Sequence, residues 1–327
     1  MPPSATTQAT GSRREYVVVH KTRYEYEQPV GLSRQIVHLA PRTTPWQECR
    51  AHTLQISPDP EILAVGEDAF GNPMTSLCIE ADHASLTVCA ESWVDVTARN
   101  YPGDHASPPW DEVRARLAYH AGQKPHPADL DAARFLFESR RVRNKRELAA
   151  WTSACFPAGA PLLVCVRALM DRIHDEFTFD PKATTVSTPV MEVFAHRRGV
   201  CQDFAHLMLS CLRSMGLAAR YVSGYVLTHP PPGRPRLVGA DASHAWISVY
   251  CPDYGWVDAD PTNAVFPMLE HITLGWGRDY DDVIPLRGVL LGGGEHELDI
   301  AVTVVPRADY ETVFGKPPSV AEVARRS

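Results

Sequence analysis

Three residue types that can together activate a thiol follow one another in the second half of this chain. Cys201 lies within the stretch GVCQDFAH, His244 lies within SHAW, and two carboxylates, Asp258 and Asp260, lie within GWVDADPTN. A cysteine, a histidine and an aspartate are the components of an activated thiol nucleophile. These residues are therefore the first candidates for chemistry.

The chemistry explains why these residue types are needed. A free thiol has a pKa of about 8.5 and is mostly protonated at neutral pH. A helix N-terminus and a neighbouring imidazolium both favour the thiolate, which can attack a carbonyl carbon. The imidazole can then protonate the leaving amine, and a carboxylate on its other nitrogen fixes its tautomer and orientation.

Hydrophobic periodicity predicts the elements that must position these side chains. An amphipathic helix is expected over residues 201–216, with Cys201 at its start. Its apolar face consists of Phe204, Leu207, Met208, Cys211, Leu212 and Met215. Strand character follows in three segments, at 220–227, 245–250 and 255–259. A turn between two antiparallel strands would bring His244 close to Asp260, and the helix packed on that sheet would direct Cys201 towards them.

Each residue alone is weak evidence for catalysis. A lone cysteine is more often an inert buried side chain, and an aspartate before proline is commonly a turn former. The joint order of the three residues favours catalysis over these interpretations. The residues themselves leave Asp258 as a competitor of Asp260 for the third role.

The same stretches resemble the motifs of the transglutaminase-like superfamily. GVCQDFAH, together with the downstream LRSMGLAARYVSGY, resembles its core, and HAW and WVDADPTN resemble its second and third motifs. The resemblance implies that Cys201 is the nucleophile, His244 the base and Asp260, in the D-P-T position, the orienting acid. It also implies an α+β fold: a papain-like core in which the cysteine helix packs on an antiparallel sheet, with the β-rich N-terminal region of bacterial members.

The function implied by the resemblance is cysteine-dependent acyl transfer on a peptide or glutamine amide, through a thioester and without metal or organic cofactor. A peptide or protein is then the substrate, and an amine is one candidate acceptor. Water as the acceptor would make the protein a cysteine peptidase or amidase, and the sequence does not separate these outcomes. A non-catalytic interaction module and a redox-sensing thiol at Cys201 also stay open.

Composition excludes several other classes of protein. The chain has 327 residues and a net charge of −7 without segregated basic regions, which argues against nucleic acid as a partner. No apolar run reaches the roughly 18 residues of a membrane span. The N-terminal segment lacks the apolar core of a signal peptide, so we expect a cytoplasmic protein. The eight cysteines include no C-x-x-C pair and no zinc-type spacing, so no structural metal is expected.

Pattern changes along the chain predict its domain organisation. A disordered leader at 1–14 is followed by short alternating runs with turn formers between them, which predict an antiparallel β domain over 15–99. A proline-rich linker is expected at 100–110, and the transglutaminase-like core with its preceding helices at 111–306. The remaining residues, 307–327, are expected to form a C-terminal tail.

Overall fold

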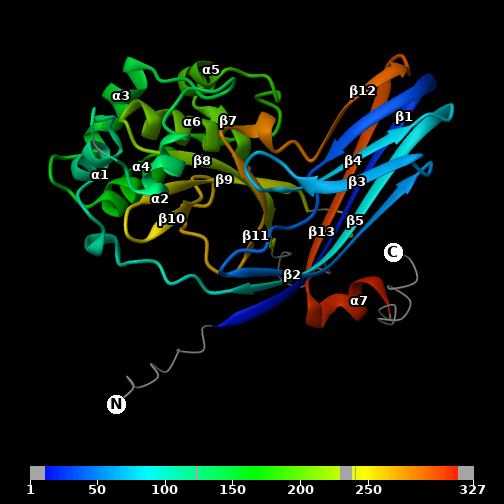
Figure 1. The fold of residues 1–327 in the computed structure, drawn as a ribbon, viewed down its shortest axis with the longest axis horizontal. Helices are drawn as coiled ribbons and strands as arrows, with labels where there is room; N and C mark the ends of the chain where they lie inside the picture. The colour runs from blue at the N-terminus through cyan, green and yellow to red at the C-terminus, as the bar shows by residue number, and fades with distance from the viewer. Residues whose placement is uncertain (1–11, 123, 229–237, 240, 316–327) are drawn as a thin grey trace.

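The computed structural model describes residues 12–122, 124–228, 238–239 and 241–315. These residues form an N-terminal antiparallel β half-barrel beside a core in which helices pack on a second antiparallel sheet. Figure 1 shows the core helices gathered on one side of the molecule and the long strands of the half-barrel on the other, with the short C-terminal helix beside those strands. The predicted α+β fold class is confirmed.

One long strand pairs with neighbours along both parts of the half-barrel. The strands are β1 (Arg13–Val37), β2 (Gln47–Ser57), β3 (Ile62–Glu67), β4 (Pro73–Ile79) and β5 (His83–Thr97). The first half of β1 pairs with β5, and its second half pairs with β4, with an irregularity between Glu25 and Val30 where the partners change. β2 extends the sheet beyond β5, and β3 extends it beyond β4.

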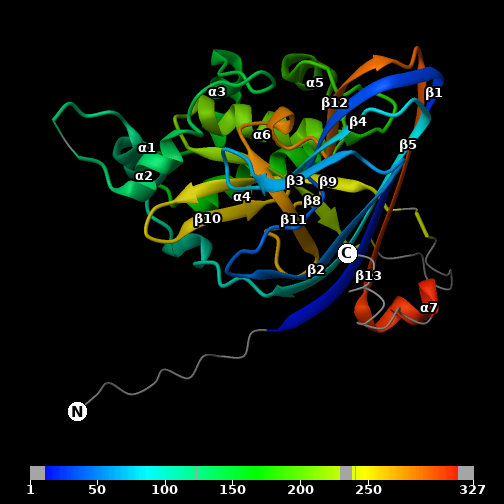
Figure 2. The same ribbon diagram turned by 45° about the vertical axis from the view of Figure 1, so that its right-hand side comes forward.

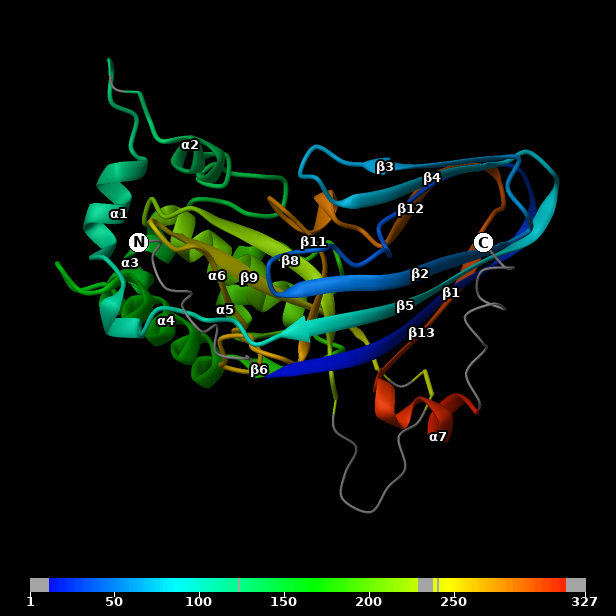
Figure 3. The same ribbon diagram turned by 60° about the horizontal axis from the view of Figure 1, so that its bottom comes forward.

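The C-terminal part of the chain returns to this half-barrel. Its elements are β12 (Leu286–Gly292), β13 (His296–Pro306), a 3-10 turn (Arg307–Asp309) and α7 (Tyr310–Phe314). β12 pairs with the second half of β1 and β13 with the first, so that β2, β5, β1 and β13 run side by side in Figure 3. The predicted core, 111–306, therefore includes two strands, β12 and β13, that belong to the half-barrel in the structure. Strand pairing joins these strands to β1, which lies at the other end of the chain. The tail is also partly ordered, since Tyr310 is buried against the outer side of β1 and β13.

The beginning of the chain and the linker also differ in detail from the prediction. β1 already begins at Arg13, inside the expected leader, and residues 1–11 lie outside the described residues. The linker contains a 3-10 turn (Asp104–Ala106) and packs against the core, because the buried Ser107 hydroxyl accepts a 2.9 Å hydrogen bond from the N–H of Leu163. The linker is therefore a packed part of the core rather than a free tether.

The core consists of a four-stranded sheet and the helices that pack around it. Its helices are α1 (Trp110–Leu117), α2 (Pro127–Ala133), α3 (Arg146–Thr152), α4 (Leu162–Glu176), α5 (Val190–His196) and α6 (Cys201–Ser214), with 3-10 turns at Ser153–Cys155 and Tyr280–Asp282. The sheet has the order β10 (Gly255–Ala259), β9 (Ser243–Cys251), β8 (Ala219–Val226), β11 (His271–Gly277). A short parallel pair, β6 (Thr178–Phe179) and β7 (Arg198–Gly199), precedes α6.

Helix α6 is the central element of the core. It packs on β8 and β9 on one side and on α3, α4 and α5 on the other, so nearly every side chain after its first turn is buried. Figure 2 shows α6 enclosed between the other helices and the sheet. This enclosure holds the start of the helix rigidly, and Cys201 occupies that start.

The half-barrel joins the core along β11, the edge strand of the core sheet. The Gln47 side-chain amide accepts the N–H of Thr273 at 2.7 Å and donates to its carbonyl at 2.8 Å. Asn72 makes the same pair of bonds with the N–H and carbonyl of Trp276, at 2.9 and 2.8 Å. Because an exposed edge leaves N–H and C=O groups without partners, these two amides complete the sheet as a further strand would.

Candidate active site

Cys201 lies at the first position of α6, half-buried, where its side chain can be reached. The Asp203 carboxylate accepts the N–H of Val200 at 2.9 Å and the Thr184 hydroxyl at 2.6 Å, which fixes the start of the helix. Gly199 is required here, since a Cβ atom at this position would lie 2.7 Å from the Asp203 carboxylate. The open N–H groups of the first turn and the helix dipole both favour negative charge at Cys201.

His244 and Asp260 are brought together by the antiparallel pairing of β9 and β10. His244 lies at the start of β9, Asp260 directly follows β10, and Ala259 pairs with Ile247 between them. The Nε2 atom of His244 lies 2.7 Å from Oδ2 of Asp260. Both side chains are buried, Asp260 completely.

The charge state of His244 follows from its two neighbours. Burial disfavours the imidazolium, but the hydrogen bond to Asp260 and the interaction with the Cys201 thiol outweigh it and raise the pKa of His244 to about 10. Because Nε2 is engaged by Asp260, Nδ1 is the nitrogen left to face Cys201. The three residues predicted from the sequence therefore meet in the order thiol, imidazole, carboxylate.

The buried Asp260 carboxylate is solvated entirely by protein donors. Its Oδ1 accepts the N–H groups of Thr262 and Asn263 at 2.9 and 3.3 Å. Its Oδ2 accepts Nδ2 of Asn263 at 2.7 Å and faces the two imidazoles of His244 and His271, at 2.7 and 2.9 Å. Burial alone would raise the pKa of Asp260, but these hydrogen bonds outweigh burial and hold that pKa well below its usual range. Asp260 therefore stays ionised at neutral pH.

Asp258, the competing carboxylate, faces a different set of partners. It forms a buried ion pair with Arg99 and accepts the indole N–H of Trp246 at 2.8 Å. Burial alone would raise the pKa of Asp258, but the Arg99 guanidinium outweighs burial and lowers that pKa. The geometry thus places Asp260, and not Asp258, on His244.

Two residues of the site were missed by sequence reasoning. His271, at the start of β11, bonds Asp260, and Trp246 packs against both imidazoles, with ring centroids 6.0 Å from His244 and 5.1 Å from His271. The signal that could have found His271 is its position, eleven residues after Asp260, at the start of an alternating stretch, HITLGW. Asn263 belongs to the quoted WVDADPTN motif, but its bond to Asp260 was not foreseen.

The same cluster is the place where a metal ion could be held. His244, Asp260 and His271 each offer one donor atom, and these atoms lie within 4.8 Å of one another. In this structure both imidazoles bond the Asp260 carboxylate directly, so these donor atoms are already hydrogen-bonded within the protein.

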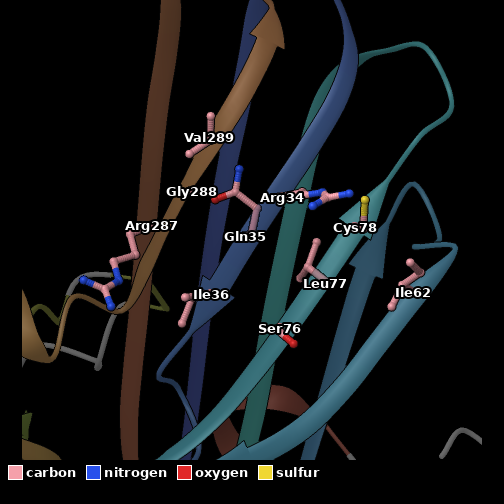
Figure 4. A pocket seen from close by; sticks show the side chains of 10 residues that line it. All are labelled: Arg34, Gln35, Ile36, Ile62, Ser76, Leu77, Cys78, Arg287, Gly288 and Val289. Atoms are coloured by element: carbon pink, nitrogen blue, oxygen red, sulfur yellow. The ribbon is translucent and has the colours of Figure 1, made fainter. Parts of the chain in front are cut away.

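Two of the pockets in the described part of the chain contain no residue of the triad. A small pocket beside α5 is bordered by Thr184, whose hydroxyl bonds Asp203, so this pocket adjoins the start of α6. A larger, mainly apolar pocket lies on the half-barrel over β12, β1, β4 and β3, lined by side chains that include Arg34, Ile62 and Val289 (Figure 4). None of the residues that line the larger pocket belongs to the triad. Over the described ranges, no helix combines the length and apolar character needed to cross a membrane.

Comparison with known proteins agrees with this architecture. Residues 157–261 match the family model of the transglutaminase-like superfamily, and residues 16–95 match the model of the bacterial transglutaminase-like N-terminal region. The match to the N-terminal region covers most of β1 to β5. The match to the superfamily model begins just before α4 and ends just after Asp260.

Similar proteins fall into full-length relatives and relatives of the core. An uncharacterized protein of Mycobacterium tuberculosis is 38% identical over 305 residues, which are 91% of this chain and 94% of that protein. A Pseudomonas aeruginosa protein named protein-glutamine gamma-glutamyltransferase is 36% identical over 106 residues, 31% of this chain and 16% of that protein.

A solved structure shares the fold over both parts of the chain. The crystal structure of a candidate cysteine protease from Cytophaga hutchinsonii has a TM-score of 0.69 and 18% identity, and the match covers 90% of this chain and 91% of that one. The chain belongs to the transglutaminase-like superfamily and carries the bacterial transglutaminase-like N-terminal region.

Proposed function

We propose that this protein is a cysteine-dependent acyl-transfer enzyme that acts on a peptide or glutamine side-chain amide. The observation that carries the proposal is the position of His244, between the Cys201 thiol and the Asp260 carboxylate, with its pKa raised to about 10. An imidazole with this pKa stays protonated at neutral pH, so it stabilises a thiolate and can later act as an acid.

The first half of the reaction forms a thioester. The Cys201 sulfur attacks the amide carbonyl carbon, a C–S bond forms, and the carbonyl electron pair moves to oxygen. The open N–H groups at the start of α6 stabilise this oxyanion. His244 then gives its proton to the amide nitrogen, the C–N bond breaks, and the amine departs from the acyl-enzyme.

The second half returns the enzyme to its starting state. The now neutral His244 takes a proton from the acceptor, the acceptor attacks the thioester, and the C–S bond breaks to regenerate the Cys201 thiolate. Asp260 holds the imidazole in orientation and stabilises its protonated form in both halves. These steps need no metal or organic cofactor.

The acceptor decides between two related activities. An amine acceptor makes the protein a transglutaminase, and the name of the Pseudomonas aeruginosa relative supports this reaction for the core. A water acceptor makes it a peptidase or amidase, and the name of the Cytophaga hutchinsonii protein supports that one. Amine transfer is our first candidate, with hydrolysis as the second, and a peptide or protein is the substrate in both.

The experiment uses a library of glutamine-containing peptides, with and without a biotinylated primary amine, and follows products and intact protein by mass spectrometry. We expect a thioester adduct on Cys201 and, with the amine, biotinylated peptide; release of free acid despite excess amine would identify the hydrolase instead. Cys201→Ser and His244→Ala should abolish both products. Equal product formation by Cys201→Ser and wild type would contradict the proposal.

Non-catalytic roles give a different result in the same experiment. An interaction module would bind peptides without forming an adduct, and a redox-sensing thiol would oxidise reversibly with no dependence on His244. Acyl transfer uses both the hydrogen-bonded pair of His244 and Asp260 and its contact with the thiol, whereas an interaction module needs neither, so we favour catalysis.

A further inference from the structure

Asp260 carries a second imidazole besides that of His244. The Nε2 atom of His271 lies 2.9 Å from the same carboxylate oxygen that His244 contacts, Oδ2. His271 is 4% exposed, and the edge of its ring faces the Trp246 indole at 84°. Because the ionised carboxylate can only accept hydrogen bonds, the nitrogen of His271 that faces it is a donor.

We propose that His271 is a positioning residue for the reaction of Cys201: it fixes the Asp260 carboxylate that orients His244, and the β half-barrel holds His271 in place. The inference rests on the proposed function, because it concerns the same triad. His271 acts only through Asp260 and does not itself touch the thiol or the substrate.

The half-barrel contacts the chain on both sides of His271. Before it, the Tyr16 hydroxyl donates to the carbonyl of Leu269 at 2.9 Å, and Arg14 forms an ion pair with Glu270 at 2.8 Å. After it, the Gln47 amide bonds both the N–H and the carbonyl of Thr273. β11 therefore cannot shift along the core sheet without breaking contacts to β1 and β2.

The physical consequence concerns the freedom of a buried carboxylate. A hydrogen bond lost in the interior is not replaced by water, so removal of His271 would leave Oδ2 of Asp260 with two fixed donors, from His244 and Asn263. The carboxylate could then rotate, and the imidazolium of His244 would be held less firmly. A weaker imidazolium stabilises a thiolate less well, so Cys201 should lose reactivity at the acidic end of its pH range.

Several titratable groups lie close enough to Cys201 to affect the pH profile of its alkylation. His244, Asp260 and His271 are joined directly, and Asp203 lies in the first turn of α6 with Cys201. Tyr221, on β8, is buried and its pKa is raised by burial first and by the neighbouring Cys201 second. Only His271 in this set is changed by the variants below.

The experiment measures the rate of iodoacetamide alkylation of Cys201 against pH in three His271 variants. His271→Leu removes the donor, His271→Gln can place an amide N–H near the position of Nε2, and His271→Asn is too short to reach Asp260. The matched control is His38→Leu, because His38 is also a buried histidine beside a carboxylate, with Nε2 3.6 Å from Asp68. His38→Leu therefore shows how far the removal of a buried histidine changes stability without changing the triad.

We expect the acidic limb of the profile to move up by about one pH unit in His271→Leu and His271→Asn, which makes alkylation about tenfold slower at pH 6. His271→Gln should restore most of the rate, and His38→Leu should lower the melting temperature without moving the limb. If His271→Leu does not fold, the comparison of His271→Asn with His271→Gln gives the answer. A wild-type profile in the Leu and Asn variants, or a shift that Gln does not rescue, would overturn the inference.

Failure of this inference can be told apart from failure of the proposed function. If wild-type Cys201 reacts quickly, His244→Ala is slow and the His271 variants match wild type, only the role of His271 is lost. If wild-type Cys201 reacts no faster than an ordinary exposed thiol, the proposed function itself fails, and with it the inference that depends on it.

Discussion

Two buried carboxylate clusters, two residues apart at the end of β10, differ in the kind of side chain that pairs with each carboxylate. Asp258 is paired with the Arg99 guanidinium, and Asp260 is paired with two imidazoles. Both carboxyl pKa values are lowered, and both residues are at most 2% exposed. Arginine cannot give up its proton in a protein, whereas histidine can. We therefore expect the Asp258 cluster to serve the structure and, on the proposed function, the Asp260 cluster to serve proton transfer.

The positions of the two clusters agree with these roles. Arg99 lies just after β5, and its guanidinium lies 4.9 Å from the ring centroid of Trp46, which precedes β2, so the Asp258 cluster fastens the half-barrel to the core. The Asp260 cluster faces Cys201 through His244 instead. The comparison predicts that a change in one cluster affects stability and a change in the other affects reactivity.

Asp260→Asn should produce the largest effect. The amide keeps the shape of the side chain but removes the charge that stabilises the His244 imidazolium, so amide turnover should fall on the order of 10³-fold or more. The measurement is the rate of amine incorporation into a peptide substrate. A turnover within a few-fold of wild type would show that the Asp260 charge is not needed for the reaction.

Asp258→Asn should instead act mainly on stability. It leaves the buried Arg99 without a counter-charge, which costs about 3–5 kcal/mol of unfolding free energy. Urea unfolding measures this loss, and Cys201 alkylation in the folded variant should stay close to the wild-type rate. A stable variant with slow alkylation would show that the two clusters are not separate.

The pH dependence of stability should distinguish the His244 imidazole from the two carboxylates by sign. The pKa of His244 is raised to about 10 in the folded state, so its contribution is fully present below its unfolded pKa of about 6.5 and is lost as the pH rises towards 10. The pKa values of Asp258 and Asp260 are lowered, so their contributions are present above about pH 4 and are lost as the pH falls.

The measurement is the melting temperature of wild type and His244→Gln between pH 6 and 10. The wild type should lose more stability than the variant over this range, because only the wild type loses the imidazolium contribution. Parallel curves for the two proteins would contradict the raised pKa of His244.

Gly275→Ala should give the smallest effect, and it tests the amide contacts along β11. The added Cβ atom would lie 2.8 Å from Oδ1 of Asn72, so the Asn72 amide must move away from the strand. We expect a loss of about 1–2 kcal/mol in unfolding free energy. The matched control is Gly66→Ala in β3, where no atom lies within 4 Å of the new methyl group. Equal stability of the two variants would show that the half-barrel does not brace β11 through Asn72.

The parts of the site that could be predicted from the sequence are those encoded by neighbouring residues. Cys201 is marked by the turn and helix around it, and His244 and Asp260 by strands joined through a short turn. His271 is not marked in this way, because its contact with Asp260 depends on β11 lying on the far side of β8. The amides of Gln47 and Asn72 were missed for a related reason, since a side chain that mimics a strand leaves no local pattern.

The same distinction applies to the fold. The alternating pattern at 298–305 is typical of a strand, but the partner of that strand, the first half of β1, lies at the other end of the chain. Periodicity predicts that a strand exists and which face it buries, whereas the choice of partner depends on the assembled sheet. The domain boundaries were therefore less accurate than the elements within them.

The most direct test of the central claim is the rate of Cys201 alkylation by iodoacetamide between pH 5 and 10, followed by intact-protein mass spectrometry. Burial raises the pKa of Cys49, Cys165 and Cys251 to about 11 and that of Cys211 to about 12, so these thiols should react slowly. We expect one fast adduct, absent in Cys201→Ser, that forms well below pH 8 and slows in His244→Ala. An unchanged rate in His244→Ala, or a wild-type rate no higher than that of an ordinary thiol, would contradict the central claim.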